Sequence, residues 1–412
     1  MKKACMRTIV FVAWLLAALG TASAQRAAQA SAPPRSALEI AAPSPATAAA
    51  LQRIEQYLWN ESRLDARSKA LLPLVTAREM SLPFEWSVRE DAALAAGLEP
   101  AVIDVVRRNG ALTKLARDDA QLVDFGRQLY RERHVDSGKF AALVARFGKQ
   151  GAFDAIMLAA YPAMAGLLQR AVDLEPGARD AKRLPSVKGV GTPAGGIGRF
   201  VAVGERPPLP KDVDEDSYYR LPLLQREELD ARGREIFDRV VGADRKAVPR
   251  GPVGMTFLSP ELVDPVQQLN SALRETGALG TRRAEIVIAA TGREMNSQYQ
   301  WLQHGGGAER AGAGKAVLDA IREDRDLAAL DERDAVAITL VRELFRESRV
   351  SPATLAAAER LFGARGAIEI AALAGDYLMI TTVYNALGMR LRPEQAATLP
   401  HRVGAPIGAE WR

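Results

Sequence analysis

The sequence contains almost no cysteine and very little histidine. Cys5 is the only cysteine among 412 residues, and it lies in an N-terminal segment that we predict is removed. Without a thiol, the remaining chain cannot form a disulfide, a cysteine nucleophile or a thiolate metal site. His134, His304 and His401 are widely separated in the sequence and predict no metal-binding cluster. We therefore expect neither a metal nor a cofactor.

Excess charge is also scarce outside the N-terminus. The formal net charge of +5 includes Lys2, Lys3 and Arg7, so the chain beyond residue 24 carries +2. Charges of both signs are mixed along the predicted helices, which is typical of a solvated surface. No dense basic stretch with interspersed aromatic residues occurs, and nucleic-acid binding is therefore not expected.

Residues 1–24 have the pattern of a secretory signal peptide. A cationic start precedes the apolar residues 8–19, and the small residues 22–24 form a cleavage motif. We predict cleavage after Ala24 and export to a bacterial periplasm. The apolar run is shorter than the about 20 residues that span a bilayer. We expect no other stretch to span one, and hence no membrane association after cleavage.

Two long stretches of the chain match each other at one constant spacing, the spacing from Ser44 to Ser259, which we call the repeat spacing. The matches extend to Gly148 with Gly363, which is hard to obtain by chance. They include Arg78 with Arg293, Glu79 with Glu294, Met80 with Met295, Trp86 with Trp301, and Gly97 with Gly312. The sequence therefore predicts a tandem duplication.

The repeat and the local composition together predict the domain organisation. Alanine, serine and proline dominate the segment before the first repeat, and glycine and proline dominate the segment between the repeats. We predict a signal peptide (1–24), a flexible lead-in (25–43), a first repeat (44–173), a Gly/Pro-rich linker (174–220), a second repeat (221–393) and an irregular tail (394–412).

Apolar residues recur with a helical period in both repeats. One predicted helix face contains Val336, Leu340, Val341, Leu344 and Phe345, and its counterpart contains Leu122, Phe125 and Leu129. Strict two-residue alternation is nearly absent. The sequence predicts an all-α fold of two tandem helical bundles, with a helix near residues 225–241 at the start of the second.

Several motifs of the second repeat together resemble those of a known family. They are Gly251-Pro252, Ser259-Pro260-Glu261-Leu262, the stretches 283–288 and 294–304, Asp376-Tyr377, and Asn385-Ala386-Leu387-Gly388. Through them the second repeat resembles the carboxymuconolactone decarboxylase superfamily, which includes the AhpD-like alkylhydroperoxidases. The first repeat resembles it more weakly, through Glu79, Phe84 and Trp86. The resemblance implies an AhpD-like bundle and a homo-oligomer, which for a two-repeat chain is expected to be a trimer.

For AhpD-like peroxidases the resemblance implies a glutamate, two cysteines and a histidine at fixed spacing. The corresponding positions here are Glu285, Ser297, Gln300 and His304, so both sulfurs are absent. A helix capped by Asn296 is predicted to place the last three on one face. Because a serine hydroxyl has no comparable thiolate chemistry, peroxidase activity is disfavoured.

The decarboxylase branch does not need the cysteines, and there the resemblance implies proton transfer on a small lactone or carboxylate. His304 is suited as the general acid–base, with Glu285 orienting its ring. Candidate substrate-binding residues are Ser297, Gln300, Tyr299 and Trp301, with Arg282, Arg283 or Arg293 for a carboxylate. The first repeat has Ala70, Leu82, Glu85 and Arg89 at the four site positions, so we interpret it as a packing partner.

The same residues could instead have structural roles. Glu285 could belong to a structural ion pair, because buried carboxylates are nearly always paired. Trp86 and Trp301 could be core anchors, because aromatic side chains dominate buried area. Arg293 and Glu294 recur in the repeat that lacks the acid–base pair, which favours a structural role. The main alternative function is therefore a non-catalytic binding or scaffold protein of the same fold.

Overall fold

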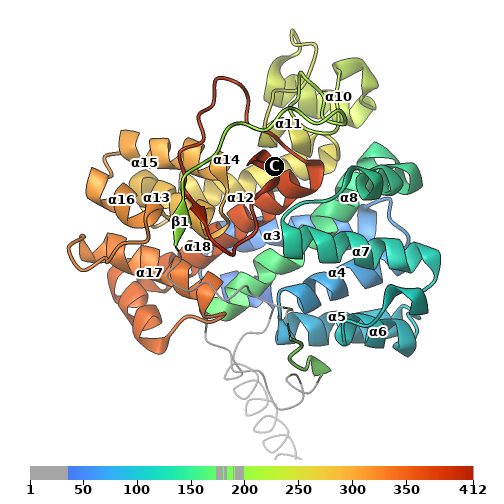
Figure 1. Cartoon of the computed structure of the whole chain (residues 1–412), viewed down its shortest axis with the longest axis horizontal. Coiled ribbons are helices and arrows are strands. Elements are labelled where there is room, and N and C mark those ends of the chain that lie inside the picture. Colours follow the sequence, from blue (N-terminus) through green and yellow to red (C-terminus); the bar gives the residue numbers. More distant parts are fainter. Residues whose placement is uncertain (1–35, 173–179, 181–182, 189, 191–198, 412) are drawn as a thin grey trace, which may run out of the picture. The chain divides into compact units, whose positions relative to one another are not determined.

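Figure 1 shows the computed structural model, which describes residues 36–172, 180, 183–188, 190 and 199–411. The regular secondary structure of the described residues is almost entirely helical, which confirms the predicted all-α class. One short antiparallel pair of strands, β1 (Phe200–Val201) and β2 (His401–Arg402), interrupts this pattern. The predicted signal peptide and its cleavage site after Ala24 lie outside the described residues.

The helices follow the same order before and after the linker, and we call the two parts the first and second halves. The first half contains α2 (Ala37–Ala41), α3 (Pro45–Gln56), α4 (Ala66–Glu79), α5 (Pro83–Ala95), α6 (Pro100–Arg107), α7 (Arg117–Glu132) and α8 (Ser137–Ala171). The second contains α10 (Ala231–Phe237), α11 (Pro252–Thr256), α12 (Val263–Arg274), α13 (Gly280–Glu294), α14 (Gln298–Gln300), α15 (Gly306–Arg310), α16 (Lys315–Arg322), α17 (Glu332–Arg346) and α18 (Pro352–Leu387).

From α4 onward, each helix has a counterpart that starts one repeat spacing later, to within a single position. Thus α4, α6, α7 and α8 correspond to α13, α16, α17 and α18, and α5 corresponds to the segment from α14 to α15. Ion pairs recur at the same spacing: Arg67 with Asp119 and Arg282 with Asp334, and Arg131 with Glu79 and Arg346 with Glu294. The two halves share one helix order, and their origin by duplication stays a prediction.

Helices α8 and α18 pack against each other and join the halves into one hydrophobic core. Gly375 permits a close approach, because a Cβ atom there would lie 2.8 Å from Cγ of Met164. Both helices bend at glycines with positive φ, Gly148 (70°) and Gly363 (72°), a conformation that favours glycine. The bends and the close contact therefore depend on the glycine positions.

Two reciprocal hydrogen bonds cross between the halves. Ser44 Oγ donates to Glu369 Oε1 of α18 at 2.7 Å, and Ser259 Oγ donates to Asp154 Oδ1 of α8 at 2.5 Å. Both serines and both carboxylates are buried. The two serines are related by the repeat spacing, and so are the two carboxylates. Each half therefore donates a hydrogen bond to a buried carboxylate of the other.

Helices α8 and α18 are long and apolar enough to span a bilayer, contrary to the expectation that no stretch beyond residue 24 would be. Their most apolar windows are 100% and 94% buried within the protein. A helix that is apolar on all sides also occurs in the core of a large protein, where neighbours cover it completely. The absence of membrane association therefore stays a prediction.

Two element boundaries differ from the sequence prediction. The predicted flexible lead-in (25–43) includes α2, which starts after a capping box between Ser36 and Glu39. The helix predicted near residues 225–241 begins only at Ala231, because Asp230 caps it by accepting a hydrogen bond from the Gly233 amide. In both cases a local capping interaction determines where the helix begins.

Residues 199–220 of the linker and the predicted irregular tail lie together over the second half, whereas Arg183 of the linker binds Asp91 of the first half. Strand β1 of the linker pairs with β2 of the tail. Arg206 of the linker donates to the carbonyl oxygens of Leu391 and Gln395 at 2.8 and 2.6 Å. The C-terminal part of the linker therefore contacts both the second half and the tail.

The reciprocal serine contacts generate a stability prediction. Ser259→Ala should lower the free energy of unfolding by about 1–3 kcal/mol, because buried Asp154 loses a hydrogen-bond donor. Ser271→Ala is the control, since its hydroxyl bonds Glu275 at an exposed position and should change stability by no more than about 0.5 kcal/mol. Urea denaturation measures both. Equal values for the two variants would contradict a stabilising contact across the halves.

Candidate active site

Glu285 and His304, which the sequence pairs by spacing, are in direct contact. Glu285 lies on α13, and His304 lies on η6 (Trp301–Gly305), a π-helical turn between α14 and α15. Nδ1 of His304 is 2.7 Å from Oε2 of Glu285. The carboxylate is buried and the imidazole is half-buried. A carboxylate accepts this bond, so Nδ1 carries the proton and Nε2 is left as the acceptor.

The surroundings favour a neutral imidazole next to an ionised carboxylate. Burial lowers the pKa of His304, although the hydrogen bond and charge of Glu285 partly oppose this. Burial alone would raise the pKa of Glu285, but His304 and Arg274 together bring that pKa below its ordinary value. Near neutral pH the pair therefore resembles a base held in place by a carboxylate.

Arg274, the last residue of α12, completes this group and was not predicted. Its NH2 donates to Oε1 of Glu285 at 2.5 Å, and its NH1 donates to Oδ1 of Asn270 at 3.2 Å. The contact depends on how α12 packs beside α13, which the motifs do not encode. One feature of the sequence could have indicated that Arg274 belongs to the site. The equivalent position of the first half is Trp59, so this position differs between the halves, as the positions of the acid–base pair do.

Gly307 makes room for the Glu285 carboxylate. A Cβ atom at Gly307 would lie 2.4 Å from Oε2 of Glu285, which is closer than real Cβ contacts. The missing side chain at 307 therefore leaves space beside the carboxylate that binds the imidazole. Any larger residue at 307 would have to displace the carboxylate.

A cavity of about 820 Å³ adjoins the group. Glu285, His304 and Arg274 line it, together with Tyr299, which was predicted as a pocket residue. Tyr377 of α18 also lines it, with ring centroids 4.8 Å from His304 in an edge-on arrangement. This volume is typical of a small-molecule site.

Three predicted site residues do not line this cavity. Ser297 is buried, and its Oγ donates to Oε1 of Glu410 in the tail at 2.5 Å. Gln300 is buried against Thr381, and the indole of Trp301 donates to Oγ1 of Thr398 at 3.2 Å. Trp301 is thus a buried core residue.

The predicted common face of Ser297, Gln300 and His304 is wrong because the helix is not regular there. Ser297 rather than Asn296 caps α14, and Asn296 has a left-handed φ of 55°. The π-helical turn then winds more widely than an α-helix. His304 consequently lines the cavity, whereas Ser297 contacts the tail and Gln300 contacts Thr381 of α18.

The predicted carboxylate-binding arginines are also occupied elsewhere. Arg282 binds Asp334 with two hydrogen bonds of 2.7 and 2.6 Å, and Arg283 lies 3.2 Å from the same carboxylate. Arg293 is buried and donates to the carbonyl oxygen of Pro400 at 2.6 Å. None of the three lines the cavity.

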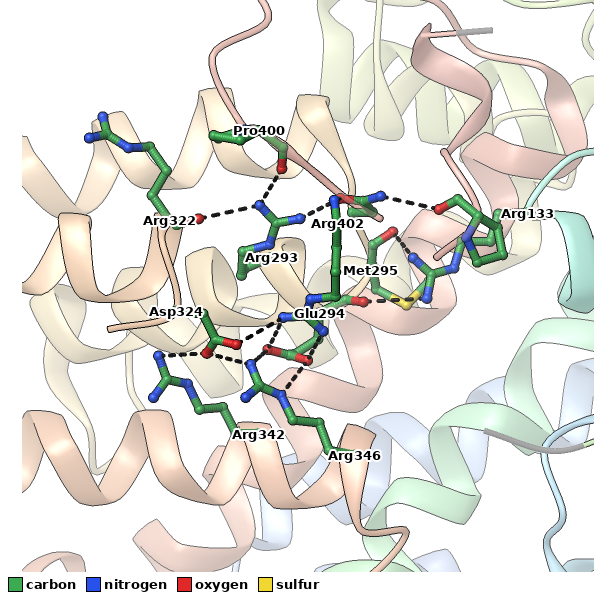
Figure 2. Close-up of polar contacts among 12 residues, drawn as sticks. Arg133, Arg293, Glu294, Met295, Arg322, Asp324, Arg342, Arg346, Pro400 and Arg402 are labelled. Atoms are coloured by element: carbon green, nitrogen blue, oxygen red, sulfur yellow. Dashed lines mark hydrogen bonds and ion pairs between the residues drawn. The ribbon is translucent and has the colours of Figure 1, made fainter. Parts of the chain in front are cut away.

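Figure 2 shows the charged cluster that surrounds Arg293. Arg346 and Arg402 both bind the Glu294 carboxylate, and Arg133 of the first half donates to the Glu294 and Met295 carbonyl oxygens. Burial lowers the pKa of Arg293 to about 9 and that of Arg133 to about 10. The cluster attaches the tail and the first half to α13, which fits the structural role that the recurrence in both halves favoured.

The corresponding positions of the first half are filled by other side chains. Arg89 stands at the position of His304, and its guanidinium lies 4.1 Å from the ring centre of Trp59, which stands at the position of Arg274. Nε of Arg89 donates to Glu85 at 2.6 Å. Ala70 stands at the position of Glu285. This region of the first half therefore contains an arginine–aromatic stack in place of an acid–base pair.

Asp376 is a second buried carboxyl near the cavity, and no role was predicted for it. Its Oδ2 accepts a hydrogen bond of 3.3 Å from Asn270, whose amide also donates to the Tyr377 hydroxyl at 3.2 Å. Its Oδ1 has no hydrogen-bond partner among the described residues. Burial raises the pKa of Asp376 to about 7. In the sequence, only the Asp376-Tyr377 motif pointed to this residue.

Comparisons with protein-family models, curated proteins and solved structures found no match. Within the described ranges, no three histidine, aspartate or glutamate side chains are grouped so that they could hold a metal ion. The site is therefore interpreted from its own geometry and from the motif resemblance.

Gly307→Ala should separate Glu285 from His304. Because the Glu285 contact raises the pKa of His304, its loss should lower that pKa further. An NMR titration of the imidazole protons measures the shift. Gly306→Ala is the matched control, since its Cβ would meet only the flexible end of Arg310. An unchanged His304 pKa in Gly307→Ala would contradict the steric argument.

Asp376 should make stability depend on pH. Its folded pKa of about 7 exceeds the unfolded value of about 3.9, so its contribution is lost as pH rises between these values. The stability difference between the wild type and Asp376→Asn should change by about 1.4 kcal/mol per pH unit in this window. Urea denaturation from pH 4.5 to pH 7 tests this. A constant difference would mean that Asp376 is ionised throughout.

Proposed function

We propose that this protein is an acid–base enzyme of the carboxymuconolactone decarboxylase type that acts on a lactone or carboxylate. The observation that supports it most is the 2.7 Å contact of His304 with Glu285 at the wall of an 820 Å³ cavity. The proposal places one such site in each chain, in the second half. It includes the predicted export to the periplasm and the predicted homo-oligomer.

In the proposed reaction, His304 moves a proton. Its neutral Nε2 accepts a proton from the substrate carbon next to a carbonyl group, and the C–H electron pair moves toward the carbonyl oxygen. Glu285 keeps the ring in the required tautomer and stabilises the imidazolium that forms. The imidazolium then returns the proton to the product, so the enzyme is unchanged at the end.

Two arginines at the cavity could bind a substrate carboxylate. Arg274 lines the cavity beside Glu285, and Arg310 lines it with an exposed side chain. Among the described residues, Arg310 forms no ion pair, so its guanidinium is available to a carboxylate. In this proposal Arg274 and Arg310 take the role that the sequence prediction assigned to Arg282 and Arg293.

The two alternative functions receive less support. A filled cavity, or an imidazole turned away from Glu285, would have favoured a non-catalytic scaffold, but the pair is in contact and a cavity adjoins it. Peroxide reduction would need thiols, and the two cysteine positions of the peroxidases are taken by Ser297 and Gln300, which bond Glu410 and Thr381. We therefore prefer proton transfer at His304.

His304→Ala should lower kcat for a lactone or carboxylate substrate roughly 10²–10⁴-fold, because general acid–base catalysis contributes a factor of that size. Turnover of a substrate panel by the protein lacking residues 1–24 measures this. His134→Ala is the control, since His134 does not line the cavity. Equal turnover by wild type and His304→Ala would remove His304 from the mechanism.

A further inference from the structure

The cavity has charged side chains beside His304 and apolar side chains along α18. Arg274 and Arg310 are the permanently charged cations among the lining residues. The other charged lining residues are the carboxylates of Glu285, which pairs with Arg274, and of Glu275. Tyr377 lies beside His304, and Met379, Ile380 and Val383 follow on the same helix. At 1.5 Å per residue, α18 extends this wall about 9 Å beyond Tyr377.

The first half supplies part of the apolar wall. Phe153 and Met157 of α8 line the cavity, and they are one helical turn apart on the same face. Both are buried, and neither makes a polar contact that would give it another role. The first half was expected to be only a packing partner, but its central helix reaches the site of the second half.

We infer that the cavity binds an amphipathic monocarboxylate, with the carboxylate at Arg274 and Arg310 and an apolar body that extends toward Phe153 and Met157. The inference rests on the proposed function in placing the reacting end of the ligand beside His304. The cavity volume of about 820 Å³ is large for a small lactone alone and suits a ligand with a substantial apolar part. With cationic groups at one end only, a second carboxylate would lie against an apolar wall.

The first experiment measures binding of butyrate, hexanoate, octanoate and decanoate by isothermal titration calorimetry. Affinity should rise about fourfold per added methylene until the cavity is filled, because each buried methylene contributes about 0.8 kcal/mol. Octylamine should bind more weakly than octanoate, because Glu285 is already paired with Arg274 and Glu275 is hydrogen-bonded by Ser271, whereas Arg310 forms no ion pair among the described residues. A flat dependence on chain length, or equal binding of octylamine and octanoate, would overturn the inference.

Variants of α8 locate the apolar end. Met157→Trp should weaken decanoate binding at least tenfold and leave butyrate unchanged, whereas Met157→Ala should extend the chain length that binds best. Met164→Ala is the matched control, since it shortens another buried methionine of α8 that does not line the cavity. If Met157 and Met164 variants change the chain-length profile equally, the placement of the apolar body is wrong.

The binding and turnover experiments can fail independently. If binding depends on chain length but His304→Ala has normal turnover, the ligand class is retained and the proposed chemistry is lost. If His304→Ala is inactive but alkyl carboxylates bind without regard to length, the proposed chemistry is retained and this ligand class is wrong.

Discussion

The packing of α8 against α18 is the interaction on which the rest of this structure depends. These apolar helices bury each other, and the close approach at Gly375 requires a residue without a side chain. The cavity lies where they meet the shorter helices, since Phe153 of α8 and Tyr377 of α18 both line it. A change in this packing would therefore alter the core and the candidate site together.

Comparison of the two halves separates structural charges from those of the site. The pair of Arg282 and Asp334 has a twin in Arg67 and Asp119, in a half that contains no acid–base pair. Such a contact stabilises the packing of the helix bundle. Arg274 has no arginine twin, because the equivalent position is Trp59. The contacts that Arg274 and His304 make with Glu285 are specific to the second half, as expected of a site and not of a scaffold.

The sequence predicted the features that depend on local pattern and on spacing. One face of α17 buries Leu340, Val341 and Leu344, as their helical period predicted. Glu285 and His304, which were paired on their spacing, are in contact. Missed features depend on tertiary packing or on irregular backbone. Arg274 reaches Glu285 only because α12 packs beside α13. No residue pattern predicted the π-helical turn that directs His304 away from Ser297.

The first half contributes to the cavity although it has no acid–base pair. An isolated second half would expose the face of α18 that α8 covers, and Ser259 would lose its hydrogen bond to Asp154. Removing Phe153 and Met157 would also open the apolar wall of the cavity to water. Water at that wall would raise the local dielectric and weaken the contact between Glu285 and His304. The first half therefore affects the proposed chemistry of the second through shape and exclusion of water, without supplying a reacting group.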